Sequence, residues 1–529
     1  MNTVKDIVIF GGKKGADKPQ YTFYNFDGEV EMKTFAQVNY DLTGLGQYLY
    51  KLGLRGKKVA ILSENSYYWI ACYFSIITGK ITAVPMDPKL PDDDIIDIMI
   101  RSGCNAIYYS EDFKDTVKKM KKTDGVVIEQ YIKIEDFYSM VEEGHNEVKN
   151  GVESYLEDDV LPSDLAFLVY TSGTTGKSKG VMLSQENVAA DSVASCRVMT
   201  GGPAIGFLPL HHAFSWVGAL FSGNLLTEWG FICRSLKDIQ KDMNTYHPQN
   251  FSAVPLAVET IYKKIWFTAK KSGREEMLKK GLKISNFLLK LGIDKRRKIF
   301  SEILNNLGGN LEMIVCGGAY LDEQYEKGME AFGIKIINGY GITECSPAVT
   351  CNRLDAYKVG SVGIPLPCNE IKIKDPDEDG IGEICVKGKN VMVGYYNDPE
   401  ATAEVFDGDW FLTGDYGYID EDGFLFFKGR KKNLIILSNG KNVSPEEIED
   451  KLSTIDYVKE VVVYEEKGYI TAEFFLDTVE TPDAKGKIKA DVNEINRKMP
   501  SYKQVTRIKT RDNEFPKTTT LKILRDYKK

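Results

Sequence analysis

A loop rich in small hydroxyl residues and glycine directly follows an apolar run of the chain. Residues 165–170 read LAFLVY and residues 171–180 read TSGTTGKSKG. A short apolar run that ends at turn-forming residues predicts a buried strand. Glycines let backbone N–H groups approach a ligand, hydroxyl groups donate hydrogen bonds, and lysine neutralises charge. The pattern therefore predicts a phosphate-binding loop at the carboxyl end of a strand, where ligands bind in α/β sheets.

The loop departs from the Walker A pattern at one position. Gly176, Lys177 and Ser178 match the end of G-x-x-x-x-G-K-[ST], but the leading glycine would stand at position 171, which is threonine. This mismatch weighs against an ordinary P-loop ATPase. A Ser/Thr/Gly-rich connector without a ligand is the structural alternative, because these residues are common in turns.

Strand and helix patterns alternate before the loop. Residues 34–52 have apolar positions at helical spacing, 58–62 form a short apolar run, 68–78 predict a buried helix, and 83–85 predict another strand. Such alternation indicates βαβ units and a largely parallel sheet. We expect an α/β fold with a large N-terminal domain of mostly parallel sheets and flanking helices.

Two stretches of this region are more polar. Residues 110–162 are charged and weakly periodic, which predicts solvent-facing helix and loop. Residues 266–308 are rich in Lys and Arg and predict two amphipathic helices. Charges on such helices are most often solvated, so neither stretch is interpreted as a binding site. No basic amphipathic membrane anchor is evident from the pattern.

The last hundred residues predict a small α+β domain. A boundary falls near residues 429–433, and a helix begins after Ser444, with Pro445 at its first position and Glu447 at its third. These residues form a capping-box pattern. Residues 458–477 predict two strands that turn at Lys467-Gly468. We divide the chain into residues 1–430 and a small, mobile C-terminal domain of residues 431–529.

Composition excludes several classes of protein. The 529 residues carry a formal net charge of −8, whereas nucleic-acid binders show a basic surplus. Nine cysteines without a C-x-x-C pair indicate reduced thiols, with neither a disulfide framework nor a zinc site. No apolar run suits a signal peptide or reaches the ~18 residues of a membrane span. We expect a cytoplasmic protein with no nucleic-acid partner and no stable membrane insertion.

The loop resembles the signature TSGTTGxPKGV of the adenylate-forming superfamily, which includes acyl-CoA synthetases, luciferases and the adenylation domains of peptide synthetases. Lys179 and Val181 match the signature, and Ser178 replaces its proline. The resemblance implies that the loop binds the β- and γ-phosphates of ATP. The implied residues are Thr171, Ser172, Gly173, Thr174, Thr175, Gly176 and Lys179.

Two further motifs follow in family order. Residues 338–344 read NGYGITE and resemble the superfamily's YGxTE motif, and residues 316–321 read CGGAYL, where Tyr320 replaces the proline of GGAPL. A tyrosine ring offers a face to adenine, and a carboxylate suits Mg²⁺. The resemblance implies a metal ligand at Glu344. It also implies ATP contacts by Gly318, Ala319, Asn338, Gly339, Tyr340, Gly341 and Thr343.

The C-terminal motifs complete the resemblance. Residues 410–417 and 427–430 match the pair in which an aspartate accepts the ribose hydroxyls and an arginine assists it, here Asp415 and Arg430. By the same resemblance Lys432 is the hinge between the domains, and Gly440 lies in the thiol channel. The tail carries Leu521 in place of the more common glycine, and Lys522 rather than Lys517 stands at the catalytic lysine position.

The acid site is implied by residues 208–216, which read LPLHHAFSW. His212 takes the family position beside the substrate carboxylate, as a catalytic residue. Relatives that activate amino acids carry an aspartate where this chain has Ala213, which weighs against an amino acid substrate. Trp216, Val217 and Gly218 either wall an acyl pocket or belong to the ordinary core.

The resemblance covers nearly the whole chain and is strongest to bacterial long-chain fatty acid–CoA ligases. It implies an ATP- and Mg²⁺-dependent ligase that forms acyl-AMP from a fatty acid and transfers the acyl group to CoA. One alternative is an acyl-AMP ligase that loads an acyl carrier protein. Another is a catalytically silent binding relative, which retention of Lys179, Glu344, Asp415, Arg430 and Lys522 argues against.

Overall fold

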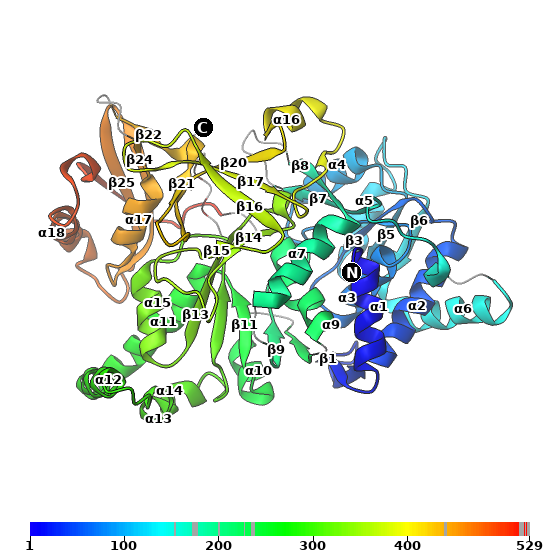
Figure 1. The fold of residues 1–529 in the computed structure, drawn as a ribbon, viewed down its shortest axis with the longest axis horizontal. Helices are drawn as coiled ribbons and strands as arrows, with labels where there is room; N and C mark the ends of the chain where they lie inside the picture. The colour runs from blue at the N-terminus through cyan, green and yellow to red at the C-terminus, as the bar shows by residue number, and fades with distance from the viewer. Residues whose placement is uncertain are drawn as a thin grey trace. The chain divides into compact units, whose positions relative to one another are not determined.

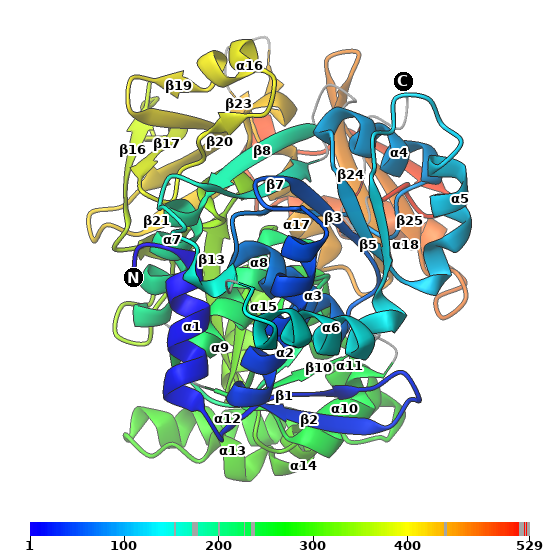
Figure 2. The ribbon, with the colours of Figure 1, turned by 90° about the vertical axis from the view of Figure 1, so that its right-hand side faces the viewer.

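The computed structural model describes residues 1–152, 155–171, 178–198, 201–226, 228–233, 238–437, 442–517, 523 and 525. Cα packing divides the chain into two compact units. The first comprises residues 1–319, 324–370 and 386–411, and the second comprises 320–323, 371–385 and 412–529. The division at 430/431 stays a prediction. Figures 1 and 2 show the chain from two directions.

Two large sheets form the framework of the first unit. Strand order is β15-β14-β13-β12-β11-β9-β10-β1-β2 in one and β18-β8-β7-β4-β3-β5-β6 in the other. Pairing is parallel from β1 through β10, β9, β11 and β12 to β13, and from β7 through β4, β3 and β5 to β6. The predicted α/β class with mostly parallel sheets is confirmed. The strands are β1 (Pro19–Tyr24), β2 (Val30–Thr34), β3 (Lys58–Leu62), β4 (Thr82–Pro85), β5 (Ala106–Tyr109), β6 (Gln130–Lys133), β7 (Leu165–Thr171), β8 (Lys179–Ser184), β9 (Ala204–Gly206), β10 (Gly230–Ile232), β11 (Asn250–Ala253), β12 (Met313–Cys316), β13 (Lys335–Gly341), β14 (Ala348–Cys351), β15 (Ile364–Pro365) and β18 (Gly394–Tyr395).

Helices flank these sheets, and one of them is buried on every side. All eleven residues of α3 are buried, and the helix contacts β3 and β4 of one sheet and β1 of the other. A helix that is apolar all round belongs inside a core. The helices of this unit are α1 (Val4–Gly15), α2 (Phe35–Lys51), α3 (Tyr67–Ile77), α4 (Asp92–Ser102), α5 (Lys114–Met120), α6 (Phe137–Lys149), α7 (Gln185–Val198), α8 (Ala213–Ser215), α9 (Ser222–Leu226), α10 (Ile239–Tyr246), α11 (Pro255–Lys271), α12 (Glu275–Lys290), α13 (Arg296–Ile299), α14 (Ser301–Asn305), α15 (Glu323–Ala331) and α16 (Pro399–Glu404).

Residues 110–162 are more ordered than the sequence pattern predicts. They supply β6, the edge strand of the seven-stranded sheet, and α6, which packs on α2. A Cβ on Gly144 would lie 1.8 Å from the carbonyl oxygen of Gly44, so the two helices meet through glycine. Tyr155 is fully buried. The expectation of solvent-facing helix and loop is therefore wrong for these parts, because their apolar positions pack against elements distant in sequence.

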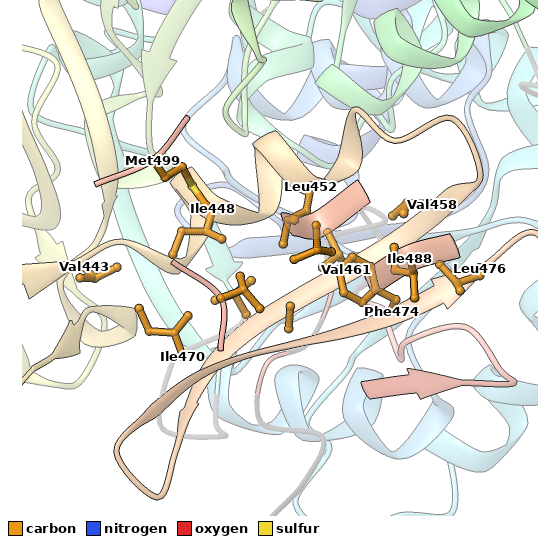
Figure 3. Close-up of a cluster of buried hydrophobic side chains, with 14 of the residues drawn as sticks. Val443, Ile448, Leu452, Val458, Val461, Ile470, Phe474, Leu476, Ile488 and Met499 are labelled. Carbon is orange, nitrogen blue, oxygen red and sulfur yellow. The ribbon is translucent and has the colours of Figure 1, made fainter. Parts of the chain in front are cut away.

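The second unit holds a smaller α+β core, which Figure 3 shows in close-up. The hairpin of β24 and β25 turns at Lys467 and Gly468 as predicted, and β26 pairs parallel to β25. The Ser444 hydroxyl caps α17 by accepting a hydrogen bond from the backbone N–H of Glu447, and Pro445 is its first residue. A further sheet has the order β16-β17-β20-β19, with β21 beside β20. The bounds are β16 (Asn369–Lys374), β17 (Gly382–Gly388), β19 (Phe406–Asp407), β20 (Trp410–Ile419), β21 (Leu425–Arg430), β22 (Ile435–Ile436), β23 (Asn442–Val443), α17 (Pro445–Ser453), β24 (Val458–Glu466), β25 (Tyr469–Leu476), α18 (Ala484–Asn496) and β26 (Arg507–Arg511).

Candidate active site

Four neighbouring parallel strands of the first unit place predicted site residues at one sheet edge. The strands β9, β11, β12 and β13 run side by side in the same direction, so their carboxyl ends meet. Gly318 and Ala319 follow β12, His212 follows β9, and Asn338 lies in the middle of β13, where the pairing with β12 ends. Gly318 has φ +87°, a conformation that favours glycine. The fold thus gathers the adenine-type motifs and the acid-type motif at a location typical of ligand binding.

The glycines of the NGYGITE motif serve strand pairing. A Cβ on Gly341 would lie 2.2 Å from the carbonyl oxygen of Pro347, and a Cβ on Gly339 would lie 3.1 Å from that of Thr350. Thr350 lies in β14, which pairs with β13, and Pro347 directly precedes that strand. A side chain at either position would therefore collide with the neighbouring backbone, and the ATP contacts implied for Gly339 and Gly341 stay a prediction. Tyr340, between them, is 8% exposed.

The side chain of Asn338 is committed to a buried carboxyl group. Its Nδ2 donates to Oε2 of Glu326 at 3.1 Å. Glu326 also accepts hydrogen bonds from the hydroxyl of Tyr357 at 2.5 Å and the backbone N–H of Gly360 at 3.0 Å. Burial raises the pKa of Glu326, and these three donors oppose that effect. The amide nitrogen of Asn338 therefore already has a hydrogen-bond partner within the protein. An ATP contact by Asn338 stays a prediction.

The predicted phosphate loop joins two antiparallel strands, β7 and β8. Thr171 at the end of β7 pairs with Lys179 at the start of β8. The predicted residues Ser172, Gly173, Thr174, Thr175 and Gly176 lie outside the described residues.

Arg101 at the end of α4 anchors the exit of this loop. Its guanidinium donates to the backbone oxygen of Ser178 at 2.6 Å and to its hydroxyl at 2.8 Å. The same group lies over the ring of Tyr170, 4.9 Å from the centroid. Arg101 therefore contacts both the end of β7, at Tyr170, and the residue that directly precedes β8.

A tyrosine that sequence reasoning missed connects the loop lysine to the predicted metal ligand. The hydroxyl of Tyr395 donates to Oε1 of Glu344 at 2.9 Å. Lys179 Nζ lies 4.7 Å from the centroid of the Tyr395 ring. Burial and the neighbouring Glu344 carboxylate raise the pKa of Tyr395, so its hydroxyl keeps its proton and acts as a donor. No local sequence pattern predicts a role for Tyr395, because its strand β18 pairs with β8, which lies more than 200 positions away in the chain.

Glu344 has surroundings that fit a magnesium ligand. It lies in the 3₁₀ turn Thr343–Cys345, and its backbone oxygen accepts a hydrogen bond from the Met392 N–H at 2.8 Å. Its carboxylate is oriented by Tyr395 and is only half-buried. Mg²⁺ is commonly held by one or two carboxylates together with phosphate oxygens. Glu344 beside Lys179 is suited to that arrangement.

The histidine pair lies where the two sheets of the first unit approach each other. His211 is buried, and its Nε2 lies 3.4 Å from Oδ2 of Asp87, which follows β4 of the seven-stranded sheet. The rings of His211 and His212 have centroids 4.3 Å apart. Ligand atoms of these three residues lie within 4.8 Å of one another, a donor set that Zn²⁺ accepts more readily than Mg²⁺ does.

Asn65 holds the histidine segment in place. Its Nδ2 donates to the backbone oxygen of Leu208 at 2.8 Å, and its Oδ1 accepts from the N–H of Leu210 at 2.9 Å. Because Asn65 follows β3, the loop after β9 is bonded directly to the neighbouring sheet. His212 thus follows shortly after a backbone segment that Asn65 holds at two points.

Trp216 belongs to the hydrophobic core. Its side chain is fully buried and stacks on Phe167 with centroids 4.8 Å apart. Its Nε1 donates to the backbone oxygen of Leu210 at 2.6 Å. Trp216, Val217 and Gly218 open a π-helical turn, Trp216–Phe221, a feature often found at functional sites. The packing favours the core alternative for Trp216, and an acyl pocket at these residues stays a prediction.

In the second unit, Asp415 and Arg430 form a pair across two strands. They are direct partners in the register of β20 and β21, and Arg430 Nε lies 2.9 Å from Oδ1 of Asp415. Asp415 is 1% exposed, whereas Arg430 is partly open to solvent. Lys432 is an exposed residue of the 3₁₀ turn Lys431–Asn433. The motif that predicted a diol-binding carboxylate therefore does contain a paired carboxylate and guanidinium.

The C-terminal tail carries two lysines that could be the catalytic one, and the structure describes only Lys517. Lys517 forms ion pairs with Glu460 and with Glu514, the latter at 2.9 Å. Lys522, the predicted catalytic lysine, and Gly440 lie outside the described residues. Arg525 pairs with Glu449 of α17, which attaches the tail to the second unit.

Sequence comparison places these features in a known family. Residues 12–396 match the AMP-binding enzyme family, and residues 432–527 match the C-terminal domain of AMP-binding enzymes. The chain belongs to the AMP-binding enzyme family. The predicted resemblance to adenylate-forming enzymes is thereby confirmed.

Relatives of this AMP-binding enzyme include several ligases. The chain is 30% identical over 458 residues to long-chain-fatty-acid–CoA ligase 6 of Mus musculus, covering 80% of this chain and 65% of the mouse protein. It is 28% identical over 556 residues to the long-chain-fatty-acid–CoA ligase of Escherichia coli, covering 96% and 91%. The fold matches O-succinylbenzoate coenzyme A synthetase of Bacillus subtilis in complex with ATP and magnesium ion, with a TM-score of 0.75, 22% identity and 98% of each chain covered.

Proposed function

We propose that this AMP-binding enzyme is an acid–thiol ligase that activates a fatty acid as acyl-AMP and then transfers the acyl group to CoA. The link from Lys179 through Tyr395 to Glu344 carries the proposal. It puts a cation, a fixed hydroxyl donor and a carboxylate at the base of a loop that suits phosphate. A catalytically silent relative would have no reason to retain this arrangement together with Asp415 and Arg430.

The first half-reaction joins the acid to AMP. A carboxylate oxygen of the acid attacks the α-phosphorus of ATP, and the bond from that phosphorus to the pyrophosphate oxygen breaks. Lys179 and the loop hydroxyls hold the β- and γ-phosphates, His212 faces the acid's carboxylate, and Lys522 balances charge near the α-phosphate. Glu344 would hold Mg²⁺, and the bound ion would supply positive charge that neutralises the phosphates.

The second half-reaction transfers the acyl group. The thiolate of CoA attacks the acyl carbon, and the bond from that carbon to the AMP oxygen breaks. Asp415 accepts hydrogen bonds from the ribose hydroxyls, and Arg430 orients the carboxylate. Between the two half-reactions the domains 1–430 and 431–529 rotate about Lys432. This rotation withdraws Lys522 from the reacting groups and brings in the segment at Gly440, which lines the path of the thiol.

Support for a fatty acid comes from the names of the mouse and Escherichia coli relatives, and Ala213 weighs against an amino acid. The named substrate of the Bacillus subtilis synthetase is an aromatic acid, so an aryl acid is the competing substrate class. An acyl carrier protein is the competing acceptor. We place the enzyme in the cytoplasm.

Product analysis by mass spectrometry tests the proposal. The protein is incubated with ATP, Mg²⁺ and a pool of short-chain, long-chain and aryl acids, with and without CoA. We expect acyl-CoA and AMP from long-chain acids, and acyl-AMP alone when CoA is omitted. Acyl-AMP that persists in the presence of CoA would favour a carrier protein as acceptor. Failure to form any adenylate would contradict the ligase assignment.

A further inference from the structure

Helix α12 exposes a row of large apolar side chains. Met277, Ile284, Phe287 and Leu291, at the helix and its end, are each between 57% and 63% exposed. Single exposed apolar residues are ordinary, but several on one element mark an interaction site. Figures 1 and 2 both show α12 at the margin of its part of the chain, together with α13 and α14.

The exposed row is separate from the face with which the helix packs. Met277, Ile284 and Leu291 are spaced by seven residues and therefore lie along one stripe, with Phe287 one turn beside it. On the other side, Ser285 is buried, and α12 contacts α11 and α13. The helix thus has one apolar face that the protein uses and a second one that points outward. We call this second face, with Leu291 and Ile293 of the following turn, the α12 face.

The surroundings of the α12 face are strongly basic. Residues 255–298 contain 13 Lys and Arg but only four Asp and Glu, in a chain whose net charge is −8. Lys279, Lys283 and Lys290 follow one flank of the apolar stripe at helical spacing. Lys279 is paired with Glu275 and Glu276. Within the part of the chain that the structure describes, Lys280, Lys283 and Lys290 have no ion-pair partner.

An apolar stripe beside a row of lysines fits a specific kind of surface. Interfacial helices lie in the plane of a membrane, with apolar side chains between the headgroups and lysines on the polar face. Lysine stems reach along apolar surface while the ammonium groups stay in water, and each basic residue near an anionic leaflet strengthens the attraction to it. At 16 residues, α12 is too short to span a bilayer but long enough to lie on one.

We propose that the α12 face docks on an anionic phospholipid bilayer. Ile284, Phe287 and Leu291 enter the headgroup region, and the flanking lysines contact lipid phosphates. Among the described residues no helix is long and apolar enough to cross a membrane, so this attachment is peripheral. It replaces two expectations from the sequence, that the charges of residues 266–308 are merely solvated and that the chain has no basic amphipathic membrane anchor. Supply of a water-insoluble acid from the bilayer would rest on the proposed function, but the docking itself does not.

Flotation of the full-length protein with lipid vesicles tests the docking. Vesicles of phosphatidylcholine alone are compared with vesicles containing 30% phosphatidylglycerol, at low and at high salt. We expect at least tenfold stronger partitioning to the anionic vesicles at low salt, with most of the difference lost at high salt. Equal binding to both vesicle types, or no binding to either, would overturn the proposal.

Two triple variants separate the apolar and the charged contributions. Ile284→Ser/Phe287→Ser/Leu291→Ser removes the apolar row, and Lys280→Gln/Lys283→Gln/Lys290→Gln removes three charges. Each should reduce partitioning to anionic vesicles by about tenfold or more. Both should retain wild-type circular dichroism and wild-type adenylation of a short, soluble acid, which separates docking from folding and from the proposed function.

A matched control changes apolar residues exposed elsewhere. Val30→Ser/Met32→Ser alters two exposed residues of edge strand β2 and should leave partitioning unchanged. Equal loss in this control and in the α12 variants would overturn the assignment to the α12 face. Multi-angle light scattering tests the rival occupant: a dimer that the triple serine variant abolishes would assign the face to a second copy of the chain and contradict lipid docking.

Discussion

The hydroxyl of Tyr395 lies 2.9 Å from Oε1 of Glu344, although the two residues are 51 positions apart. One partner comes from the two-residue strand β18 and the other from a 3₁₀ turn after β13. The contact therefore joins the two large sheets of the first unit. It also aims one oxygen of the carboxylate, leaving the other for a ligand.

Removing that hydroxyl should weaken magnesium-dependent catalysis. A hydrogen bond to a charged group contributes ~1.5–3 kcal/mol, so Tyr395→Phe should lower kcat for adenylation by about 10–100-fold and raise the Mg²⁺ concentration needed for half-maximal rate. Initial rates of pyrophosphate release over a Mg²⁺ series measure both. The neighbouring Tyr396→Phe loses only a contact with Lys58 and should stay within about threefold of wild type. Equal losses in both variants would remove the special role of Tyr395.

Asp415 should govern affinity for the nucleotide. A carboxylate can accept both ribose hydroxyls, whereas an amide offers one acceptor atom, so Asp415→Asn should raise the Kd for ATP by roughly tenfold or more. Titration with a fluorescent ATP analogue measures this. The control, Asp409→Asn, removes an exposed carboxylate that pairs with Lys387 and should not change the Kd. Unchanged affinity in Asp415→Asn would argue against diol binding at this pair.

Substitutions of the two lysines of the tail should affect the two half-reactions differently. Lys522→Ala should abolish formation of acyl-AMP while leaving thioester formation from synthetic acyl-AMP largely intact. Lys517→Ala is the matched control: because Lys517 pairs with Glu460 and Glu514, its loss should lower the Tm slightly and leave both half-reactions within a few fold. Separate assays of the two half-reactions decide this. A comparable loss in both half-reactions of Lys522→Ala would contradict its assigned step.

Asp191 should make stability depend on pH. It lies on α7 with no exposed surface, and burial raises the pKa of its carboxyl well above the ordinary value, against a hydrogen bond from the Ala348 N–H. The folded protein thus retains a proton that the unfolded chain releases near pH 4. The free energy of unfolding therefore falls as pH rises above that value, by up to ~1.4 kcal/mol per pH unit.

Asp191→Asn removes this dependence without removing much volume. The quantity to compare is the free energy of unfolding of the variant minus that of the wild type. This difference should be larger at pH 8 than at pH 5 by about 1–3 kcal/mol. Urea denaturation at the two pH values measures the difference. Asp115→Asn changes an exposed carboxyl whose pKa is lowered by Lys118, and it should show no gain at pH 8. A gain of the same size at both pH values would mean that Asp191 is ionised in the folded protein.

Local patterns predicted the elements that depend on neighbours in sequence. The helix that follows Thr34, the strand that begins at Lys58 and the hairpin that turns at Lys467 all have the expected positions within one or two residues. Apolar periodicity and turn residues act over a few positions, so they are readable without a fold. The same patterns did not predict the buried elements of residues 110–162, because β6 is a strand only through its pairing with β5.

The sequence by itself determined the chemistry on offer: a glycine- and hydroxyl-rich loop with Lys179, a carboxylate at Glu344, and Asp415 and Arg430 in recognisable motifs. Only the tertiary structure decided how some of these groups are used. In the folded protein Tyr395 donates a hydrogen bond to Glu344, and Asn338 donates one to Glu326. The apolar row of α12 is exposed to solvent. The physical reason is that motifs arise from contiguous residues, whereas hydrogen-bond partners and burial are set by packing between segments far apart in the chain.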